Sequence, residues 1–227
     1  MNDALDNLLR DRRVWRAVKT SDDSISPGLA PGLDTGLETG LATGYPKLDR
    51  QLPGGGWPRQ ALTEILLEHY GTGELKLLMP ALARLGHAAD AADDNPAEDG
   101  WIAWIAPPFQ PYPPALLQWG IDLSRMLIVH PRQGSETLWA AEQALSSGNC
   151  AAVLLWPESL DHTTSRRLQL AAVKGRSRAF AFRPLKALLQ PSAATLRLRL
   201  SAGEQGTDIG ILKSRGGRPV VVRDYAE

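Results

Sequence analysis

The stretch LTEILLEHYGTGELKLL, residues 62–78, decides the fold. It begins with an apolar strand pattern, continues through a turn that contains Gly71 and Gly73, and ends in an apolar helical pattern. A strand–turn–helix junction of this kind is where phosphate-binding loops lie, because the backbone N–H groups at the start of the helix point toward an anion. The stretch therefore predicts an α/β domain built around such a junction.

The residues of this turn argue against nucleotide chemistry. A working loop has the pattern GxxxxGK[ST], in which lysine neutralises the phosphates and the hydroxyl holds Mg²⁺. Here Gly71, Thr72 and Gly73 are followed by Glu74 and Leu75 at the lysine and hydroxyl positions. A carboxylate at the helix start repels a triphosphate. We therefore interpret the turn as a degenerate phosphate-binding loop and expect no cofactor.

Apolar strand patterns alternate with helical patterns through the middle of the chain. This alternation predicts a mostly parallel sheet with helices on both faces. After it, three short segments separated by turns predict an antiparallel meander that closes one edge. The expected strands are 61–67, 101–105, 126–130, 151–156 and 178–182, the expected helices are 73–87, 114–119, 135–147 and 162–174, and the expected meander strands are 195–201, 208–213 and 219–223.

The N-terminal part is expected to lie outside this domain. Residues 1–19 fit an amphipathic helix, in which Leu5, Leu8, Leu9 and Trp15 share an apolar face suited to a partner. Residues 20–43 are predicted to be a flexible linker, because glycine recurs at every fourth position from Gly28 to Gly44 and disfavours helix. The domain itself is expected to span residues 44–227.

Formal net charge is zero, but the charges are unevenly distributed along the chain. Residues 68–161 carry a net charge of −8 and residues 162–223 a net charge of +11. This contrast indicates a basic face that either binds nucleic acid or an acidic protein, or is an ordinary solvated surface. Any DNA binding by it would be weak, independent of sequence and sensitive to salt. The residues assigned to this face are Arg166, Arg167, Lys174, Arg176, Lys213, Arg215 and Arg218, with Arg178, Arg183 and Lys186 beside them.

Several functional classes find no support in the sequence. The chain has one cysteine, Cys150, at the entry to an apolar strand, which indicates a small core residue. The four histidines lie in separate elements without metal-ligand spacing, and no serine lies in a GxSxG turn. The N-terminus lacks the apolar region of a secretory signal, and no apolar run approaches the length of about 20 residues that a membrane helix needs. We expect a cytoplasmic protein.

Residues 44–223 resemble the ATPase core of the recombinase RecA, and are still more similar to the RecA-like, SulA-related ImuA family of translesion synthesis operons. Two stretches, LPGGGWP and GTGELKLLMPALARL, are fairly specific, whereas each of the others alone is weak. The stretches that carry the resemblance are GYPKLDRQLPGGGWPRQALTEIL, HYGTGELKLLMPALARL, WIAWIAPPFQPYPPAL, GIDLSRMLIV, ETLWAAEQALSSG, AAVLLWPES and ILKSRGGRP.

Compared with the RecA pattern, three catalytic parts are missing. Glu74 and Leu75 replace the lysine and the hydroxyl, or Gly73 and Glu74 do so if the loop is one residue shorter. The strand that would end in a catalytic glutamate ends instead in 105–108, Ile-Ala-Pro-Pro, and the strand that would end in a Mg²⁺-binding aspartate ends in Trp156. Glu158 comes too late to replace it. Without a cation clamp, a metal ligand and a water activator, phosphoryl transfer has no support, so the resemblance implies a protein that is not an enzyme.

The resemblance implies a non-catalytic accessory factor in SOS-induced mutagenic translesion DNA synthesis and DNA repair. Its expected partner is an ImuB-like polymerase homologue, with RecA and a C-family error-prone polymerase as further candidates. It would act by mimicry, presenting a RecA-shaped surface where a RecA protomer docks. The alternative is a SulA-like cell division inhibitor that binds FtsZ.

Overall fold

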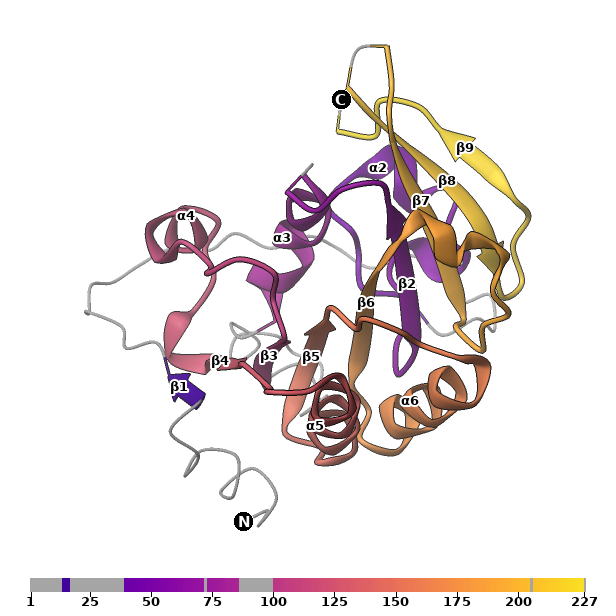
Figure 1. The fold of residues 1–227 in the computed structure, drawn as a ribbon. Coiled ribbons are helices and arrows are strands. Elements are labelled where there is room, and N and C mark those ends of the chain that lie inside the picture. Colours follow the sequence, from indigo (N-terminus) through magenta and orange to yellow (C-terminus); the bar gives the residue numbers. More distant parts are fainter. Residues whose placement is uncertain (1–13, 17–38, 72, 86–99, 205, 227) are drawn as a thin grey trace.

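A nine-stranded sheet forms the centre of the protein, as seen in a computed structural model that describes residues 14–16, 39–71, 73–85, 100–204 and 206–226 (Figure 1). The strand order is β1-β4-β3-β5-β6-β2-β7-β8-β9. The strands are β1 (Val14–Arg16), β2 (Leu62–Leu67), β3 (Trp101–Ile105), β4 (Met126–Val129), β5 (Cys150–Leu155), β6 (Arg178–Pro184), β7 (Leu196–Ala202), β8 (Thr207–Ser214) and β9 (Val220–Val222).

The sheet is mostly parallel, which confirms the predicted α/β class. Strand β2 lies between β6 and β7 and runs parallel to both, and β3 runs parallel to β4 and β5. Because parallel neighbours end at the same edge, the turn after β2 and the connections after β3 and β5 lie along one side of the molecule. This edge is where the candidate site lies.

The predicted meander is also confirmed. Strand β7 pairs antiparallel with β8, and β8 pairs antiparallel with β9. The pattern Leu196, Leu198 and Leu200 supplies the core-facing side of β7, because side chains alternate between the two faces of a strand. The meander adds three strands to the parallel sheet through the β2–β7 pairing.

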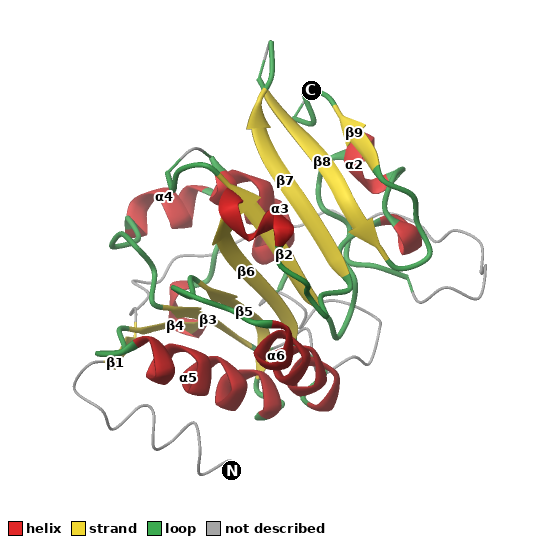
Figure 2. Cartoon of the chain, turned by 45° about the vertical axis from the view of Figure 1, so that its right-hand side comes forward, coloured by secondary structure: helices red, strands yellow, loops and turns green. Residues whose placement is uncertain are grey.

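Helices cover the sheet on both faces (Figure 2). Helices α2, α3 and α4 pack with the aromatic core on one face, and α5 and α6 pack with a core of small aliphatic side chains on the other. The side of the strand decides which core a residue joins: Trp104 lies in the aromatic core and Ala103 in the aliphatic one. The helices are α2 (Pro46–Asp49), α3 (Glu74–Arg84), α4 (Pro113–Gln118), α5 (Gly134–Ser146) and α6 (His162–Lys174).

Helix α6 begins where its sequence supplies a cap. The Asp161 carboxylate accepts a hydrogen bond from the backbone N–H of Thr164 at 2.7 Å, and this bond lowers the pKa of Asp161. It satisfies one of the N–H groups that have no partner inside the helix. The observed helix 162–174 matches the predicted one.

The N-terminal helix prediction is wrong for the three described residues of that segment. Val14–Arg16 form strand β1, which pairs antiparallel with β4 so that Trp15 lies opposite Ile128. A single apolar edge strand offers backbone hydrogen bonds that override a weak local helical preference. Leu5, Leu8, Leu9 and the rest of residues 1–13 lie outside the described residues.

The predicted linker extends too far toward the domain. Leu41 pairs with Trp57 through two backbone hydrogen bonds of 2.7 and 2.9 Å, and both residues are buried. Thr43 is fully buried, and its N–H donates to the Asp49 carboxylate at 2.8 Å. The packed domain therefore includes residues 39–43, and residues 20–38 lie outside the described part.

A buried charge cluster lies on the α6 side of the sheet. The Glu64 carboxylate, fully buried on β2, accepts from Arg183 at 3.1 Å, from Arg197 at 2.9 Å and from the Ser192 hydroxyl at 2.6 Å. Arg183 also donates to the backbone oxygen of Leu160. The expectation that Arg183 belongs to an exposed basic face is therefore wrong. Arg178, only 2% exposed, is also buried, contrary to that expectation.

Candidate functional site

The turn between β2 and α3 is shaped by two glycines. Gly71 and Gly73 have backbone φ angles of 84° and 96°, a region that glycine adopts without a steric penalty. Glu74, the first residue of α3, is 4% exposed, and its Oε1 accepts a hydrogen bond from the N–H of Gly71 at 2.9 Å. The carboxylate thus folds back into the turn at the positive end of the helix dipole. This is the place that a bound anion would occupy.

The strand ends beside this turn carry apolar residues. After β3 the chain continues through Ala106, Pro107 and Pro108, and after β5 through Trp156, which is 6% exposed. The Trp156 ring stacks on Phe182 with centroids 4.7 Å apart and lies 5.6 Å from the Trp104 ring. Glu158 is exposed beyond the strand end. Thr72 lies outside the described residues, and Leu75 packs partly buried against the aromatic core.

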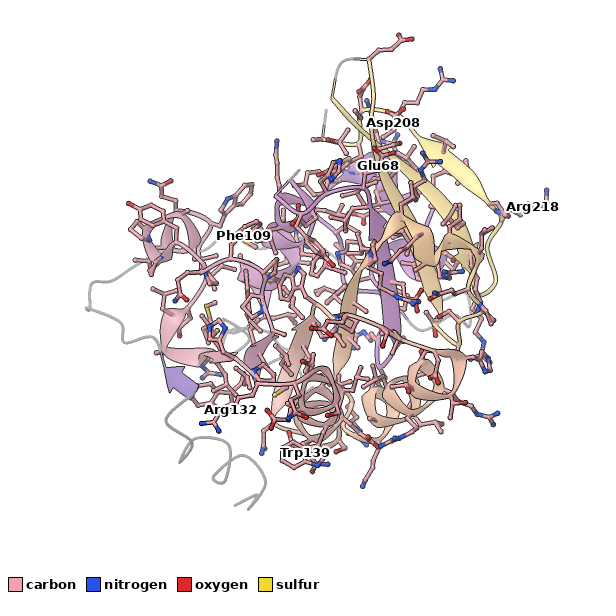
Figure 3. The ribbon with its side chains drawn as sticks, viewed as in Figure 1. Glu68, Phe109, Arg132, Trp139, Asp208 and Arg218 are labelled. Carbon is pink, nitrogen blue, oxygen red and sulfur yellow. The ribbon has the colours of Figure 1, made fainter. Side chains whose placement is uncertain are left out.

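A cavity of about 400 Å³ opens between the turn and these strand ends. Its walls come from the start of α3, the connection between β3 and α4, helix α4 itself, Trp104 of β3 and Trp156, which directly follows β5. Figure 3 shows Phe109 on the β3–α4 connection next to α3. The lining residues that carry the argument below are Glu74, Trp104, Phe109, Tyr112, Trp119 and Trp156.

The rim of the cavity is aromatic and exposed. Phe109 is 65% exposed, Tyr112 69% and Trp119 41%. Large aromatic side chains grouped around a hollow are typical of a binding surface rather than of an ordinary exterior. Lys76 and Glu74 are the charged residues among those that line the cavity.

Three polar atoms among the residues that line this cavity are buried without a hydrogen-bond partner in the described part of the protein. They are Glu74 Oε2, Trp104 Nε1 and Trp156 Nε1. Each such atom is unfavourable, because it has lost water and gained nothing in exchange. Grouped at one cavity, they mark a place where a ligand could supply two acceptors and one donor.

Tyr70 directly precedes Gly71 of the turn, and its pKa is affected by Glu74. Burial raises the pKa of its hydroxyl, the nearby Glu74 carboxylate raises it further, and Arg183 lowers it. Tyr70 is therefore within electrostatic range of both Glu74 and the buried Arg183.

All seven residues assigned to the basic face are exposed. Arg166, Arg167 and Lys174 lie on α6, and Arg176 follows it. Lys213, Arg215 and Arg218 lie at the end of β8 and in its connection to β9; Figure 3 shows Arg218 projecting there. The segment 192–195 joins the two groups: Ser192 accepts from Lys213 at 3.1 Å, and Ala193 donates to Ser165 of α6 at 3.0 Å.

Comparison with known proteins places the chain in a family. The model of the family described as "Cell division inhibitor SulA" matches residues 63–179, which is 117 of the 227 residues. The chain belongs to the SulA family. The matched range holds the turn, the cavity and helices α5 and α6.

Relatives of two kinds share this SulA-family sequence. SulA of Photorhabdus laumondii is 30% identical over 54% of this chain and 63% of its own length, and SulA of Pectobacterium carotovorum is 33% identical over 48% and 59%. The chain thus spans about three fifths of the length of these SulA relatives. Protein ImuA of Caulobacter vibrioides is 29% identical over 77% of this chain and 78% of its own. The solved structure of SulA from Pseudomonas aeruginosa matches 54% of this chain and 97% of its own, with 25% identity and a TM-score of 0.42.

The described residues contain neither a metal-binding cluster nor a membrane-spanning helix. No group of three or more His, Cys, Asp or Glu side chains there could hold a metal ion. Within the same residues, no helix combines the length and apolarity that crossing a membrane requires.

The aromatic cavity is a feature that sequence reasoning missed. The segment FQPYPP at 109–114 follows the expected strand 101–105 and leads into the expected helix 114–119, and it forms one wall of the cavity. The available signal was the density of aromatic residues around the strand ends at 104, 109, 112, 119 and 156.

Proposed function

We propose that the protein is a non-catalytic accessory factor of SOS-induced mutagenic translesion DNA synthesis and DNA repair, which acts through protein–protein contacts. The observation that carries this proposal is the Glu74 carboxylate, which hydrogen-bonds the Gly71 N–H at the start of α3. A site that supplies its own anion has little use for a nucleotide phosphate. The turn is, in this proposal, a degenerate phosphate-binding loop in a RecA-like domain.

The extent of the similarity supports the choice between the two kinds of relative. The match to the ImuA relative covers more than three quarters of both chains, whereas the matches to the SulA relatives cover between 48% and 62% of this chain. Both names belong to the response to DNA damage. The longer match favours the translesion role, with an ImuB-like polymerase homologue as the primary partner and RecA and a C-family error-prone polymerase as further partners.

The experiment that tests the proposal is co-elution on a sizing column. The purified full chain is mixed with the ImuB-like polymerase homologue of its host, and a parallel sample contains FtsZ. We expect a stable complex with the former. A shift with FtsZ and none with the polymerase homologue would contradict the translesion role.

The absence of catalysis is tested by phosphate release. The full chain is incubated with Mg²⁺ and ATP, with and without single-stranded DNA. We expect no release above a buffer control, because apolar residues stand where phosphoryl transfer needs carboxylates, at Pro108 and Trp156. Turnover that disappears on substitution of a residue in the turn would overturn this part of the proposal.

A second function, inhibition of cell division by binding FtsZ, is favoured by one observation. The SulA family model covers residues 63–179, which include most of the parallel sheet. Overexpression tests it directly, since a division inhibitor makes the host cells grow as filaments. Cells of normal length at high expression would leave the translesion role as the better explanation.

The basic face has a separate role in the proposal, as a weak contact to DNA. Its seven cationic side chains would contact the phosphates of the DNA backbone. Binding should therefore not depend on the base sequence. We expect binding of a single-stranded oligonucleotide to fall steeply between 50 and 200 mM salt, by an order of magnitude or more. Binding that is unchanged over this range would exclude the electrostatic contact.

A further inference from the structure

We infer that the aromatic cavity binds an arginine side chain presented by an extended apolar segment of a partner protein. This inference rests on the proposed function, because it names the chemistry by which one partner is recognised. The cavity is defined here by Glu74, Trp104, Phe109, Tyr112, Trp119 and Trp156.

The buried charge of the cavity selects a cation, because Lys76, which also lines the cavity, is exposed to solvent, whereas Glu74 is buried. Glu74 has one oxygen bonded to the turn and a second, Oε2, without a donor among the described residues, although the side chain is 4% exposed. A buried carboxylate with an unused oxygen is complementary to a guanidinium, which carries five N–H donors in a fixed plane. A phosphate or an acidic peptide would be repelled at the same position.

The aromatic rim selects arginine over lysine. A guanidinium is flat and weakly hydrated, so it stacks on aromatic rings, whereas an ammonium is a compact and strongly hydrated charge. Phe109, Tyr112 and Trp119 expose rings at the opening, and Trp104 and Trp156 contribute rings to the wall. A cation that enters this cavity therefore meets rings before it meets the carboxylate.

The indole N–H groups of Trp104 and Trp156 indicate that the arginine belongs to a polypeptide. Trp104 Nε1 and Trp156 Nε1 are donors without acceptors in the described part of the chain. Backbone carbonyls on either side of an arginine residue supply two acceptors at short spacing, and neighbouring apolar side chains suit the apolar wall. These atoms are buried in the unbound chain, so binding of the segment requires side chains that line the cavity to change rotamer, a common rearrangement on binding.

The test follows the indole N–H signals of the full chain by ¹H–¹⁵N NMR. Trp104→Phe and Trp156→Phe variants assign the two signals, and Trp139, 55% exposed on α5 and absent from the cavity lining, serves as an internal reference. The probe is the peptide acetyl-Ser-Leu-Arg-Leu-Ser-amide, and the control is the same peptide with citrulline in place of arginine. We expect saturable shifts of Trp104 and Trp156 but not of Trp139, and binding at least tenfold weaker for citrulline.

Variants of the protein locate the contact. Glu74→Gln should weaken peptide binding at least tenfold, and Tyr112→Ala, at a side chain 69% exposed that can be removed without loss of core, at least fivefold. Glu68→Gln is the matched control: this residue follows the same strand but is exposed and does not line the cavity. It should leave binding unchanged.

Three results would overturn the inference. The first is equal binding of the arginine and citrulline peptides, and the second is equal peptide binding by the wild type and the Glu74→Gln and Tyr112→Ala variants. The third is that oligo(dT), and not the peptide, shifts the Trp104 and Trp156 signals. The co-elution experiment tests the proposed function separately from this inference. If the cavity binds the peptide but the chain forms no complex with the polymerase homologue, the proposed function is contradicted. If the complex forms and is unchanged by Tyr112→Ala, the role of the cavity in recognising the partner is contradicted.

Discussion

Two buried carboxylates, ten residues apart, lie in opposite situations. Glu64 on β2 is fully buried and has partners for both oxygens: Arg183 and Ser192 for Oε1, and Arg197 for Oε2. Glu74 at the start of α3 is 4% exposed and, among the described residues, has a partner for one of its two oxygens. A carboxylate with all its bonds made holds strands together, whereas one with a bond unmade is available to something else. The comparison separates a structural charge from a candidate binding charge within one strand–turn–helix unit.

The largest expected effect comes from breaking the complete cluster. Glu64→Gln leaves Arg183 and Arg197 buried without a counter-charge, which should lower the free energy of unfolding by about 3–5 kcal/mol. Urea denaturation followed by far-UV circular dichroism measures it. The matched control is Glu142→Gln on the surface, because Glu142 pairs with Arg167, which is 59% exposed. A loss of under about 1 kcal/mol for Glu64→Gln would show that the cluster is not structural.

The reactivity of the single cysteine provides a second measurement of the destabilisation by Glu64→Gln. Cys150 is 2% exposed on β5, and burial raises the pKa of its thiol to about 12, so it stays protonated and unreactive in the folded chain at pH 8. Labelling with a thiol reagent should therefore need unfolding. For Glu64→Gln we expect labelling faster by on the order of a hundredfold, the equivalent of about 3 kcal/mol. An unchanged labelling rate alongside lowered urea stability would mean that the thiol is reached by a local opening.

A smaller effect is expected at the incomplete site. Glu74→Ala removes the hydrogen bond to Gly71 and the favourable charge at the start of α3, which should lower the free energy of unfolding by about 1 kcal/mol. Glu74→Gln keeps an acceptor for Gly71 and should cost less. The same urea titrations measure both. A loss as large as that of Glu64→Gln would erase the distinction between the two carboxylates.

The smallest effect on stability is expected at the solvent-exposed ion pair between Arg167 and Glu142. Replacing Arg167 by alanine breaks its pair with Glu142 between α6 and α5, and should change the free energy of unfolding by about 0–1 kcal/mol, because exposed ion pairs contribute little. Raising the salt concentration should shrink even this difference. A large, salt-resistant loss would mean that the α5–α6 contact depends on this pair.

Much of the sheet could be predicted from sequence because its strands are uniformly apolar and its helices amphipathic. The ends of β2, β3 and α6 agree with the predicted ranges to within one residue. Predictions from the local sequence pattern were wrong where the structure of a segment depends on residues distant in sequence. Val14–Arg16 became a strand through pairing with β4, and Arg197, in the alternating segment TLRLRLS, turned inward to meet Glu64.

The candidate site was predictable only in part, for a similar reason. The replacement of lysine by Glu74 is visible in the sequence, but the return of its carboxylate to Gly71 depends on the turn geometry. Trp104 and Trp156 could be assigned to a core. That Tyr112 and Trp119 gather over the same hollow depends on how α4 packs, which no local pattern encodes. A glutamate in the middle of the apolar strand LTEILL is the signal that foretells a buried charge cluster.

The short strand β1 has a consequence for handling the protein. It covers β4, whose residues Met126–Val129 are all apolar and buried. Removing the first 16 residues would leave β4 as a bare edge with its backbone groups unpaired, the arrangement that recruits strands from other molecules. A shortened chain would thus tend to aggregate, and its failure to bind a partner would say nothing about Leu5, Leu8 and Leu9. Point substitutions in the intact chain avoid this confusion.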